Sequence, residues 1–259
     1  MDDEVLACGG TIAQLKNKES IYIIFITDGG GKQYHKLLSY VDINAIRIGE
    51  SIAALDVLGV SKNNIKFLNF PDGQLRKEFN SLVSELQANI NSIKPDHIFI
   101  PFRYDWHQDH ILLNKACINA YLNIDFRATI LEYFVYTRWH LLKKKDMRKY
   151  IRPELLITVD INDVKEMKRN ALNCFISQTT NYFQNQTRPV LGKEILEESC
   201  NTPEIFLKTD GTHLEDVFLG SHFWLSFISY LEPLLKNQKD RIIFLVQKFK
   251  KSFTLLGLN

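Results

Sequence analysis

Short apolar runs recur along the chain, separated by segments of different rhythm. Such runs are typical of strands that are buried on both faces of a parallel sheet. The runs that predict strands are IYIIFIT (21–27), IKFLNF (65–70), HIFIP (97–101), ATILEYFVY (128–136) and ELLITVD (154–160).

The segments between these runs carry apolar residues at helical spacing. In 41–58 the apolar stripe is formed by Ile48, Ile52 and Leu55, and Gly59 follows as a C-cap. The same rhythm predicts helices over 78–93, 110–121 and 164–175. Because strand and helix alternate, the pattern predicts βαβ units whose right-handed crossovers place helices on both faces. We therefore expect an α/β fold, Rossmann-like and doubly wound, with a mostly parallel sheet.

Composition narrows the class of protein. The chain has 259 residues, of which 45% are hydrophobic and 24% charged, as is ordinary for a soluble globular protein. The net charge of +2 gives no global field that would select nucleic acid, so no nucleic-acid partner is expected. The cysteines show no CxxC spacing and follow no secretory segment, which predicts reduced thiols and a cytoplasmic location. The sequence does not indicate an oligomeric state.

The C-terminal part of the chain follows another pattern. Its longest apolar stretch, 217–231, is shorter than the ~20 residues that span a bilayer, so no transmembrane segment is expected. From Arg241 onward, apolar residues and lysines separate onto two sides of a helix. This pattern fits either packing against the domain or weak contact with a membrane surface. We expect 207–259 to form a helical extension.

Polar clusters follow three of the predicted strands. These clusters are TDGGG (27–31), FPDG (70–73) and PFRYDWHQDH (101–110). Because ligands bind beyond the carboxyl ends of parallel strands, we expect the three loops to form one site. The third loop is the densest, with Asp105, His107, Asp109 and His110. Imidazoles and carboxylates are zinc ligands, so one histidine is a candidate ligand and the other a candidate catalytic group.

The chain begins with MDDEVLACGG, in which Asp2 and Asp3 lead into a small-residue segment typical of a helix start. This segment has the form of a loop that follows a strand, yet none of the predicted strands precedes it. We therefore expect that the first strand of the sheet is missing. We also expect the coding frame to continue upstream of Met1 through Pro and His codons into an apolar strand.

Taken together and in order, several motifs resemble the PIG-L/LmbE-like zinc-dependent de-N-acetylases. That family includes N-acetylglucosaminyl-phosphatidylinositol deacetylase and the deacetylases of mycothiol and bacillithiol synthesis. The motifs are DDE (2–4), TDGGG, RIGESIAALDVLG (47–59), FPDGQL (70–75), DWHQDH (105–110), and SQ (177–178) ahead of PEIF (203–206). The resemblance implies a deacetylase domain over 1–206.

Carried over position by position, the resemblance implies the parts of a zinc site. Asp3 and His110 would bind Zn²⁺, and Asp2 would be the general base. His107 would polarise the reacting amide or protonate there, and Asp109 would orient His107.

The resemblance also implies a substrate. Arg47 and Asp72 would contact the sugar of a small-molecule amino-sugar conjugate. The implied reaction removes an acetyl group from an N-acetylated amino sugar or glycoconjugate of the N-acetylglucosaminyl type, with a zinc-activated water as the nucleophile.

Simpler interpretations of these residues stay open. Asp2 and Asp3 could cap the helix that follows them. Arg47 and Glu50 could be an exposed ion pair on a helix, and Asp72 could be only a turn residue.

Two other functions also stay open. The chain could be a catalytically impaired sugar-binding module of the same fold. It could instead bind a nucleotide through the glycines at 29–31, although the GxGxxG pattern typical of dinucleotide binding is absent.

Overall fold

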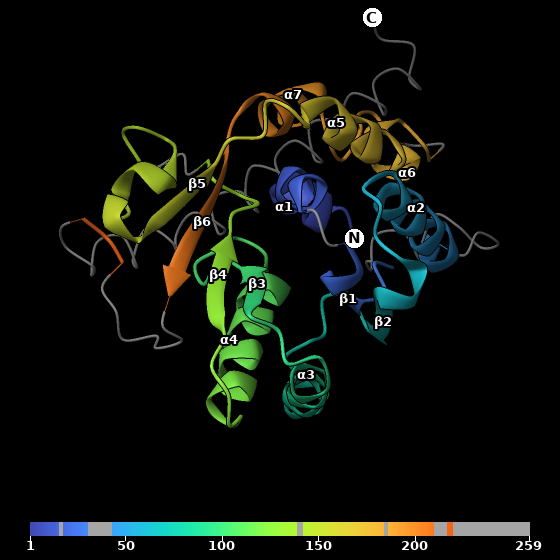
Figure 1. Ribbon diagram of the computed structural model, residues 1–259. Coiled ribbons are helices and arrows are strands. Elements are labelled where there is room, and N and C mark those ends of the chain that lie inside the picture. Colours follow the sequence, from blue (N-terminus) through green and yellow to red (C-terminus); the bar gives the residue numbers. More distant parts are fainter. Residues whose placement is uncertain (16–17, 31–42, 139–141, 184–185, 210–216, 220–259) are drawn as a thin grey trace, which may run out of the picture.

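The computed structural model describes residues 1–15, 18–30, 43–138, 142–183, 186–209 and 217–219 (Figure 1). Its helices and strands are α1 (Asp3–Gln14), β1 (Ile23–Thr27), α2 (Ile43–Val57), β2 (Ile65–Phe70), α3 (Phe79–Ile93), β3 (His97–Pro101), α4 (Gln108–Leu122), β4 (Thr129–Tyr133), β5 (Leu156–Val159), α5 (Lys165–Asn173), α6 (Ile176–Thr179), α7 (Lys193–Asn201) and β6 (Glu204–Thr209).

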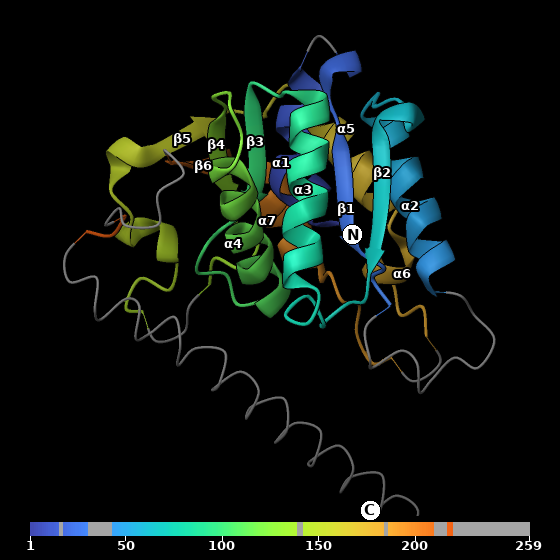
Figure 2. The ribbon, with the colours of Figure 1, turned by 90° about the horizontal axis from the view of Figure 1, so that it is seen from below.

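The strands form a mixed sheet in two parts, with helices on both faces. β1 and β2 pair in parallel, and so do β3 and β4. Figure 1 shows α3 and α4 on one face and α1, α5 and α7 on the other, and Figure 2 shows the same layers from below. The structure therefore confirms the predicted α/β fold class with helices on both faces.

β6 lies between β4 and β5 and runs antiparallel to both, in the strand order β3-β4-β6-β5. The strands are thus less parallel than expected. β6 comes last among the described strands and inserts between β4 and β5 in the antiparallel direction, whereas a βαβ crossover would have produced a parallel pair. β6 also crosses the expected boundary between 1–206 and 207–259. The division of the chain into those two parts stays a prediction.

The two parts of the sheet are not joined by hydrogen bonds between the described strands. None of these strands pairs with both β1 and β3. Figure 1 shows the N-terminus beside α1 and β1. The expected further strand ahead of Asp2 has no counterpart in the described ranges and stays a prediction.

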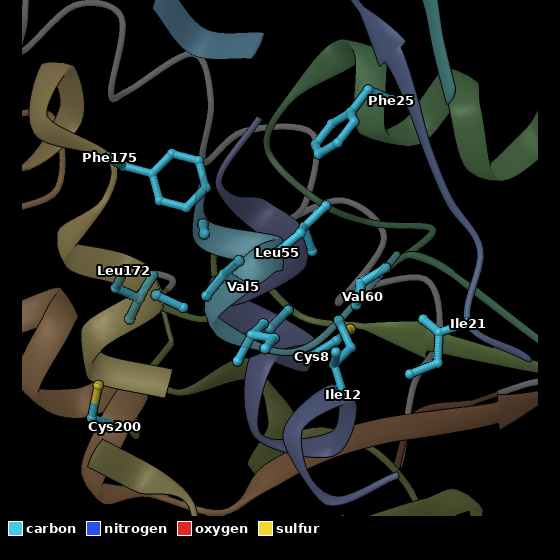
Figure 3. Close-up of a cluster of buried hydrophobic side chains, with 14 of the residues drawn as sticks. Val5, Cys8, Ile12, Ile21, Phe25, Leu55, Val60, Leu172, Phe175 and Cys200 are labelled. Atoms are coloured by element: carbon cyan, nitrogen blue, oxygen red, sulfur yellow. The ribbon is translucent and has the colours of Figure 1, made fainter. Parts of the chain in front are cut away.

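The face covered by α1 and α5 holds the core that supports the start of the chain. Figure 3 shows its centre, where Val5 and Cys8 of α1 lie near Leu55 of α2 and Leu172 of α5. Val5 and Leu55 are fully buried, and burial of such a side chain stabilises the fold by about 1.5–3 kcal/mol. Apolar packing therefore fixes α1 against its neighbours.

The opposite face holds a second core, between the sheet and the helices α3 and α4. Its centre is formed by Leu82, Ile90, Ile100, Ala116 and Ile130. The apolar stripe of α3 reaches this core because its members are spaced three and four residues apart. The loops at the carboxyl ends of the strands are thus held from both faces of the sheet.

The buried carboxylate of Glu204, 194 residues further along the chain than Gly10, anchors α1. Glu204 of β6 accepts hydrogen bonds from the N–H groups of Gly10 at 2.7 Å and Thr11 at 2.8 Å. Its Oε1 also lies 2.8 Å from Lys168 Nζ, and both side chains are nearly inaccessible to solvent. Since a buried charge is costly unless it is paired and hydrogen-bonded, these partners make the burial of Glu204 tolerable.

No helix in the described ranges is both long enough and apolar enough to cross a membrane. The predicted amphipathic tail from Arg241, and all of 217–231 beyond residue 219, lie outside the described residues.

Candidate active site

A pocket of about 250 Å³ runs along the whole of β1, beside the end of β3 and the starts of α1 and α4. It is lined by all the residues to which the sequence analysis assigns roles: Asp2, Asp3, Arg47, Asp72, His107, Asp109 and His110. These residues come from segments that are far apart in the sequence. Their convergence follows from the fold, because the loops after parallel strands meet at one edge of the sheet.

His110 lies between two carboxylates. Its Nε2 is 3.4 Å from Asp3 Oδ2, and its Nδ1 is 3.1 Å from Asp105 Oδ1. Burial acts to lower the pKa of His110, but Asp3 and Asp105 outweigh it and raise the pKa to about 10. Burial acts to raise the pKa of Asp3, but the charge and hydrogen bond of His110 outweigh it and lower the pKa. The imidazole therefore holds its proton firmly between two anions.

Asp2 precedes α1 in a strained backbone conformation. Its φ of 117° lies in the left-handed region, which costs a non-glycine residue of order 1–3 kcal/mol. Its carbonyl accepts the first hydrogen bonds of the helix, but its side chain makes no capping bond. Capping therefore does not explain this aspartate. Burial, together with the charge of Asp3, raises the pKa of Asp2 to about 8.

His107 and Asp109 both stand at the start of α4, but they contact different groups. The N–H of His107 donates to Asp105 Oδ1 at 2.8 Å, and the N–H of Gly73 donates to Asp109 Oδ2 at 2.6 Å. Burial raises the pKa of Asp109. Within the described residues, His107 Nδ1 is buried without a hydrogen-bond partner. Asp109 thus holds the 70–73 loop, and an orienting contact from Asp109 to His107 stays a proposal.

The loop after β1 sets the surroundings of Arg47 and Asp72. Asp28 Oδ1 accepts hydrogen bonds from the N–H groups of Gly30 at 3.0 Å and Asp72 at 3.1 Å, which ties two loops together. Gly29 has a φ of +66°, and a Cβ at this position would lie 3.0 Å from Arg47 Cδ. The backbone conformation therefore favours glycine here, and a Cβ would also press against the side chain of Arg47.

The described residues fit zinc in donor type. Asp3 and His110 present a carboxylate oxygen and an imidazole nitrogen to each other, and Asp105 stands behind the ring as a partner that orients a ligand. In the described ranges, no group of three or more His, Cys, Asp or Glu side chains is arranged to hold a metal ion. The facing pair is thus smaller than the set of three protein ligands that a catalytic zinc ordinarily has.

Three residues reach the site without a role in the sequence analysis. Asp105 contacts His110, the ring of Tyr136 stacks on that of His110 with centroids 6.0 Å apart, and Gln178 lines the pocket. Asp105 stood in the densest polar loop, so its residue type and position could have suggested a role. Tyr136 could not be found, because the strand predicted over 128–136 ends earlier, at Tyr133.

Comparison with models of protein families matches residues 1–121 to PIG-L, described as GlcNAc-PI de-N-acetylase. A comparison with curated proteins gives no match.

Solved structures share the fold. N,N′-diacetylchitobiose deacetylase from Pyrococcus horikoshii has a TM-score of 0.55 and 23% identity, over 83% of this chain and 83% of that chain. The zinc-inhibited form of teicoplanin deacetylase Orf2 has a TM-score of 0.59 and 16% identity, over 80% of this chain and 94% of that chain. GalB, the 4-carboxy-2-hydroxymuconate hydratase from Pseudomonas putida, has a TM-score of 0.56 and 16% identity, over 85% of this chain and 95% of that chain. Because these proteins differ in activity, the likeness establishes the fold and leaves the reaction to the site.

Proposed function

Residues 1–121 match the PIG-L family, described as GlcNAc-PI de-N-acetylase, and from this premise we propose that the protein is a metal-dependent hydrolase of N-acetylated amino sugars. The reaction removes the acetyl group from an amino sugar or glycoconjugate of the N-acetylglucosaminyl type. The observation that carries the proposal is the convergence of the predicted residues on one pocket, above all the facing pair Asp3 and His110. The fold alone would not carry it, since a hydratase has the same fold.

In this proposal Asp3 and His110 hold a zinc ion, and Asp105 fixes the ring of His110 through Nδ1. A bound zinc ion would supply two kinds of chemistry, a lowered pKa of water and polarisation of the acetamide carbonyl. His110 must give up its Nε2 proton to become a ligand, because metal and proton compete for the same nitrogen.

Asp2 is the proposed general base. It lies beside Asp3 in the pocket and is held there by α1. Its carboxylate takes a proton from the attacking water as the new C–O bond forms. It then gives a proton to the nitrogen as the C–N bond breaks, so that the products are acetate and a free amine.

His107 is the proposed donor at the reacting amide. Negative charge develops on the carbonyl oxygen when water adds, and a donor placed there lowers the barrier. The buried and unpartnered Nδ1 of His107 supports such a role, because a group of the substrate can then serve as its partner. Asp109 keeps the neighbouring 70–73 loop in place through Gly73.

Arg47 and Asp72 are the proposed contacts to the sugar. Both line the pocket, and they differ in hydrogen-bonding capacity. A guanidinium only donates, whereas an ionised carboxylate only accepts. Together they can bind a hydroxyl group as acceptor and as donor.

The direct test measures acetate release from an N-acetylglucosamine conjugate together with the zinc content of the purified protein. His110→Ala should abolish both, because it removes one of two ligands. His97→Ala is the matched control, since His97 lies exposed at the start of β3 and away from the pocket. Equal activity of the wild type and His110→Ala would overturn the proposal.

A sugar-binding module without turnover is the second candidate. It is favoured by one observation, namely that no group of three or more possible metal-binding side chains forms among the described residues, where Asp3 and His110 face each other as a pair. A wild-type protein that binds N-acetylglucosamine, contains no zinc and releases no acetate would establish this candidate in place of the first.

The proposed partner is a small-molecule amino-sugar conjugate. A cytoplasmic location, and weak contact of the C-terminal tail with a membrane surface, stay predictions from the sequence.

A further inference from the structure

A chain of hydrogen bonds leads from α2 into the pocket. Glu50 accepts two hydrogen bonds from Ser177, each 2.6 Å long. Its Oε1 accepts from the backbone N–H, and its Oε2 accepts from the hydroxyl group. The side-chain Nε2 of Gln178 lies 3.0 Å from the same hydroxyl oxygen. The chain therefore joins α2 to the side chain of Gln178 through Ser177.

Counting protons fixes the orientation of the Gln178 amide. A hydroxyl has one proton, and an ionised carboxylate has no proton to donate. The Ser177 hydroxyl must therefore donate to Glu50, and it can only accept from Gln178. The amide group next to Ser177 must be the NH₂, so the carbonyl Oε1 of Gln178 points elsewhere.

The other contacts of Gln178 show which groups remain available to hydrogen-bond with its side-chain carbonyl. Its backbone is fixed at both ends, since its N–H donates to the Phe175 carbonyl at 3.0 Å and its carbonyl accepts from Leu191 at 2.8 Å. The residue is only 1% exposed and lines the pocket together with Arg47 and Asp72. No hydrogen bond to Gln178 Oε1 occurs within the described residues. Gln178, which lines the candidate site, thus carries a side-chain carbonyl that has no hydrogen-bond partner among the described residues.

We propose that Gln178 determines specificity by accepting, through its side-chain carbonyl, a hydrogen bond from a hydroxyl or amide N–H of the substrate's sugar. Glu50 is a positioning residue, which holds this acceptor in place through Ser177. The inference rests on the proposed function and adds a requirement to it. The substrate must carry a hydrogen-bond donor on the sugar, so a simple alkyl acetamide is a poor substrate.

The first test replaces Gln178 by Met, which keeps the approximate shape and removes the acceptor. For an N-acetylglucosamine conjugate, KM and the dissociation constant of N-acetylglucosamine should both rise about three- to tenfold, the effect of one neutral hydrogen bond. The kcat should change little. The matched control is Gln87→Met, since Gln87 lies on α3 and donates to the Asn123 carbonyl outside the pocket.

The second test separates positioning from general stability. Gln at position 50 would donate its own NH₂ to the Ser177 hydroxyl, which would free the hydroxyl proton to face Gln178 and turn the amide round. Glu50→Gln should therefore weaken N-acetylglucosamine binding about as much as Gln178→Met does. The double variant should be no worse than either single one, because both changes remove the same acceptor.

These outcomes distinguish failure of the inference from failure of the proposed function. Binding of N-acetylglucosamine that is unchanged in Gln178→Met would overturn the inference, whether or not the wild type releases acetate. Additive losses in the double variant would overturn the positioning role of Glu50. A wild type that binds the sugar through Gln178 but releases no acetate would leave the inference intact and overturn hydrolysis. A wild type that does not bind N-acetylglucosamine at all would overturn both.

Discussion

The pKa values of two neighbouring carboxyl groups at the start of α1, those of Asp2 and Asp3, are shifted in opposite directions. Asp3 faces the imidazolium of His110, which outweighs its burial and lowers its pKa. At Asp2, burial and the charge of Asp3 prevail and raise the pKa to about 8. Residues adjacent in the sequence thus differ in charge near neutral pH, where Asp3 is ionised and Asp2 largely holds its proton. In the proposed function, Asp2 accepts a proton only in its ionised form, which a nearby cation would favour.

Cys117 of α4 provides a prediction about pH at the same scale. Burial raises the pKa of its thiol to about 12, whereas an unfolded cysteine titrates at about 8.5. The folded state holds the proton more tightly, so this stabilising contribution is complete below about pH 8.5 and is lost as the pH rises toward 12. Between pH 8.5 and 10, wild type should lose about 2 kcal/mol of unfolding free energy that Cys117→Ala does not lose.

Urea unfolding at the two pH values measures this difference. Cys174→Ala is the control, since Cys174 is only partly buried and should contribute less. If Cys117→Ala fell in stability as steeply as the wild type, the thiol would not be the source of the pH dependence.

At the scale of elements, Gly10 of α1 and Gly49 of α2 both lie inside a helix, but they have different surroundings. A Cβ on Gly10 would lie 2.3 Å from Ile161 Cγ2, whereas a Cβ on Gly49 would meet nothing within 4 Å. Gly10 therefore allows Ile161 to pack directly against α1. Gly49 has no comparable neighbour among the described residues, and a glycine inside a helix lowers its stability relative to alanine.

The same substitution should consequently have opposite effects in the two helices. Gly10→Ala should destabilise the protein by about 1–3 kcal/mol, because Ile161 or α1 must move. Gly49→Ala should stabilise it by about 0.5–1 kcal/mol, because alanine restricts the unfolded chain and favours the helix. Thermal and urea unfolding of the two variants measure both effects. A Gly10→Ala variant as stable as the wild type would contradict the close packing of α1.

Elements with a strong local pattern were predictable from the sequence. The strands expected over 65–70 and 97–101 coincide with β2 and β3, and the helix expected over 78–93 differs from α3 by one residue at its start. β6 and α7 were not predicted. Their apolar residues show no clear period, and β6 is defined by pairing with β4 and β5, which no local pattern encodes.

The candidate site also has parts that the sequence predicts and parts that it does not. Its loops could be predicted, because polar residues that follow parallel strands must meet at one edge. The contact of His110 with Asp105 and the route from Glu50 to Gln178 could not. Both depend on side-chain directions, and the second joins residues brought together only by the packing of α2 against α6.

At the scale of the whole molecule, metal binding should change stability. A ligand that binds only the folded state, at about 100 times its dissociation constant, stabilises by about 2.7 kcal/mol. For a chain of this size that corresponds to a rise in Tm of about 5–10 °C. Zinc should produce this rise in the wild type, and a chelator should reverse it.

Asp3→Asn and His110→Ala show where the metal binds. Both variants should lack the rise, because each removes a proposed ligand. An equal rise in Asp3→Asn would place the stabilising metal at another group, such as the cysteines, and would contradict the proposed site.

The anchoring of α1 by Glu204 also constrains when the pocket can be completed. The N–H of Gly10 and its acceptor are 194 residues apart in the sequence. During translation α1 leaves the ribosome well before β6 does. Contacts of such long range form late, because a large loop must close before they contribute. A nascent chain that stops before Glu204 would carry Asp2 and Asp3 on a helix without its anchor. The protein should therefore gain its site only after β6 has been made.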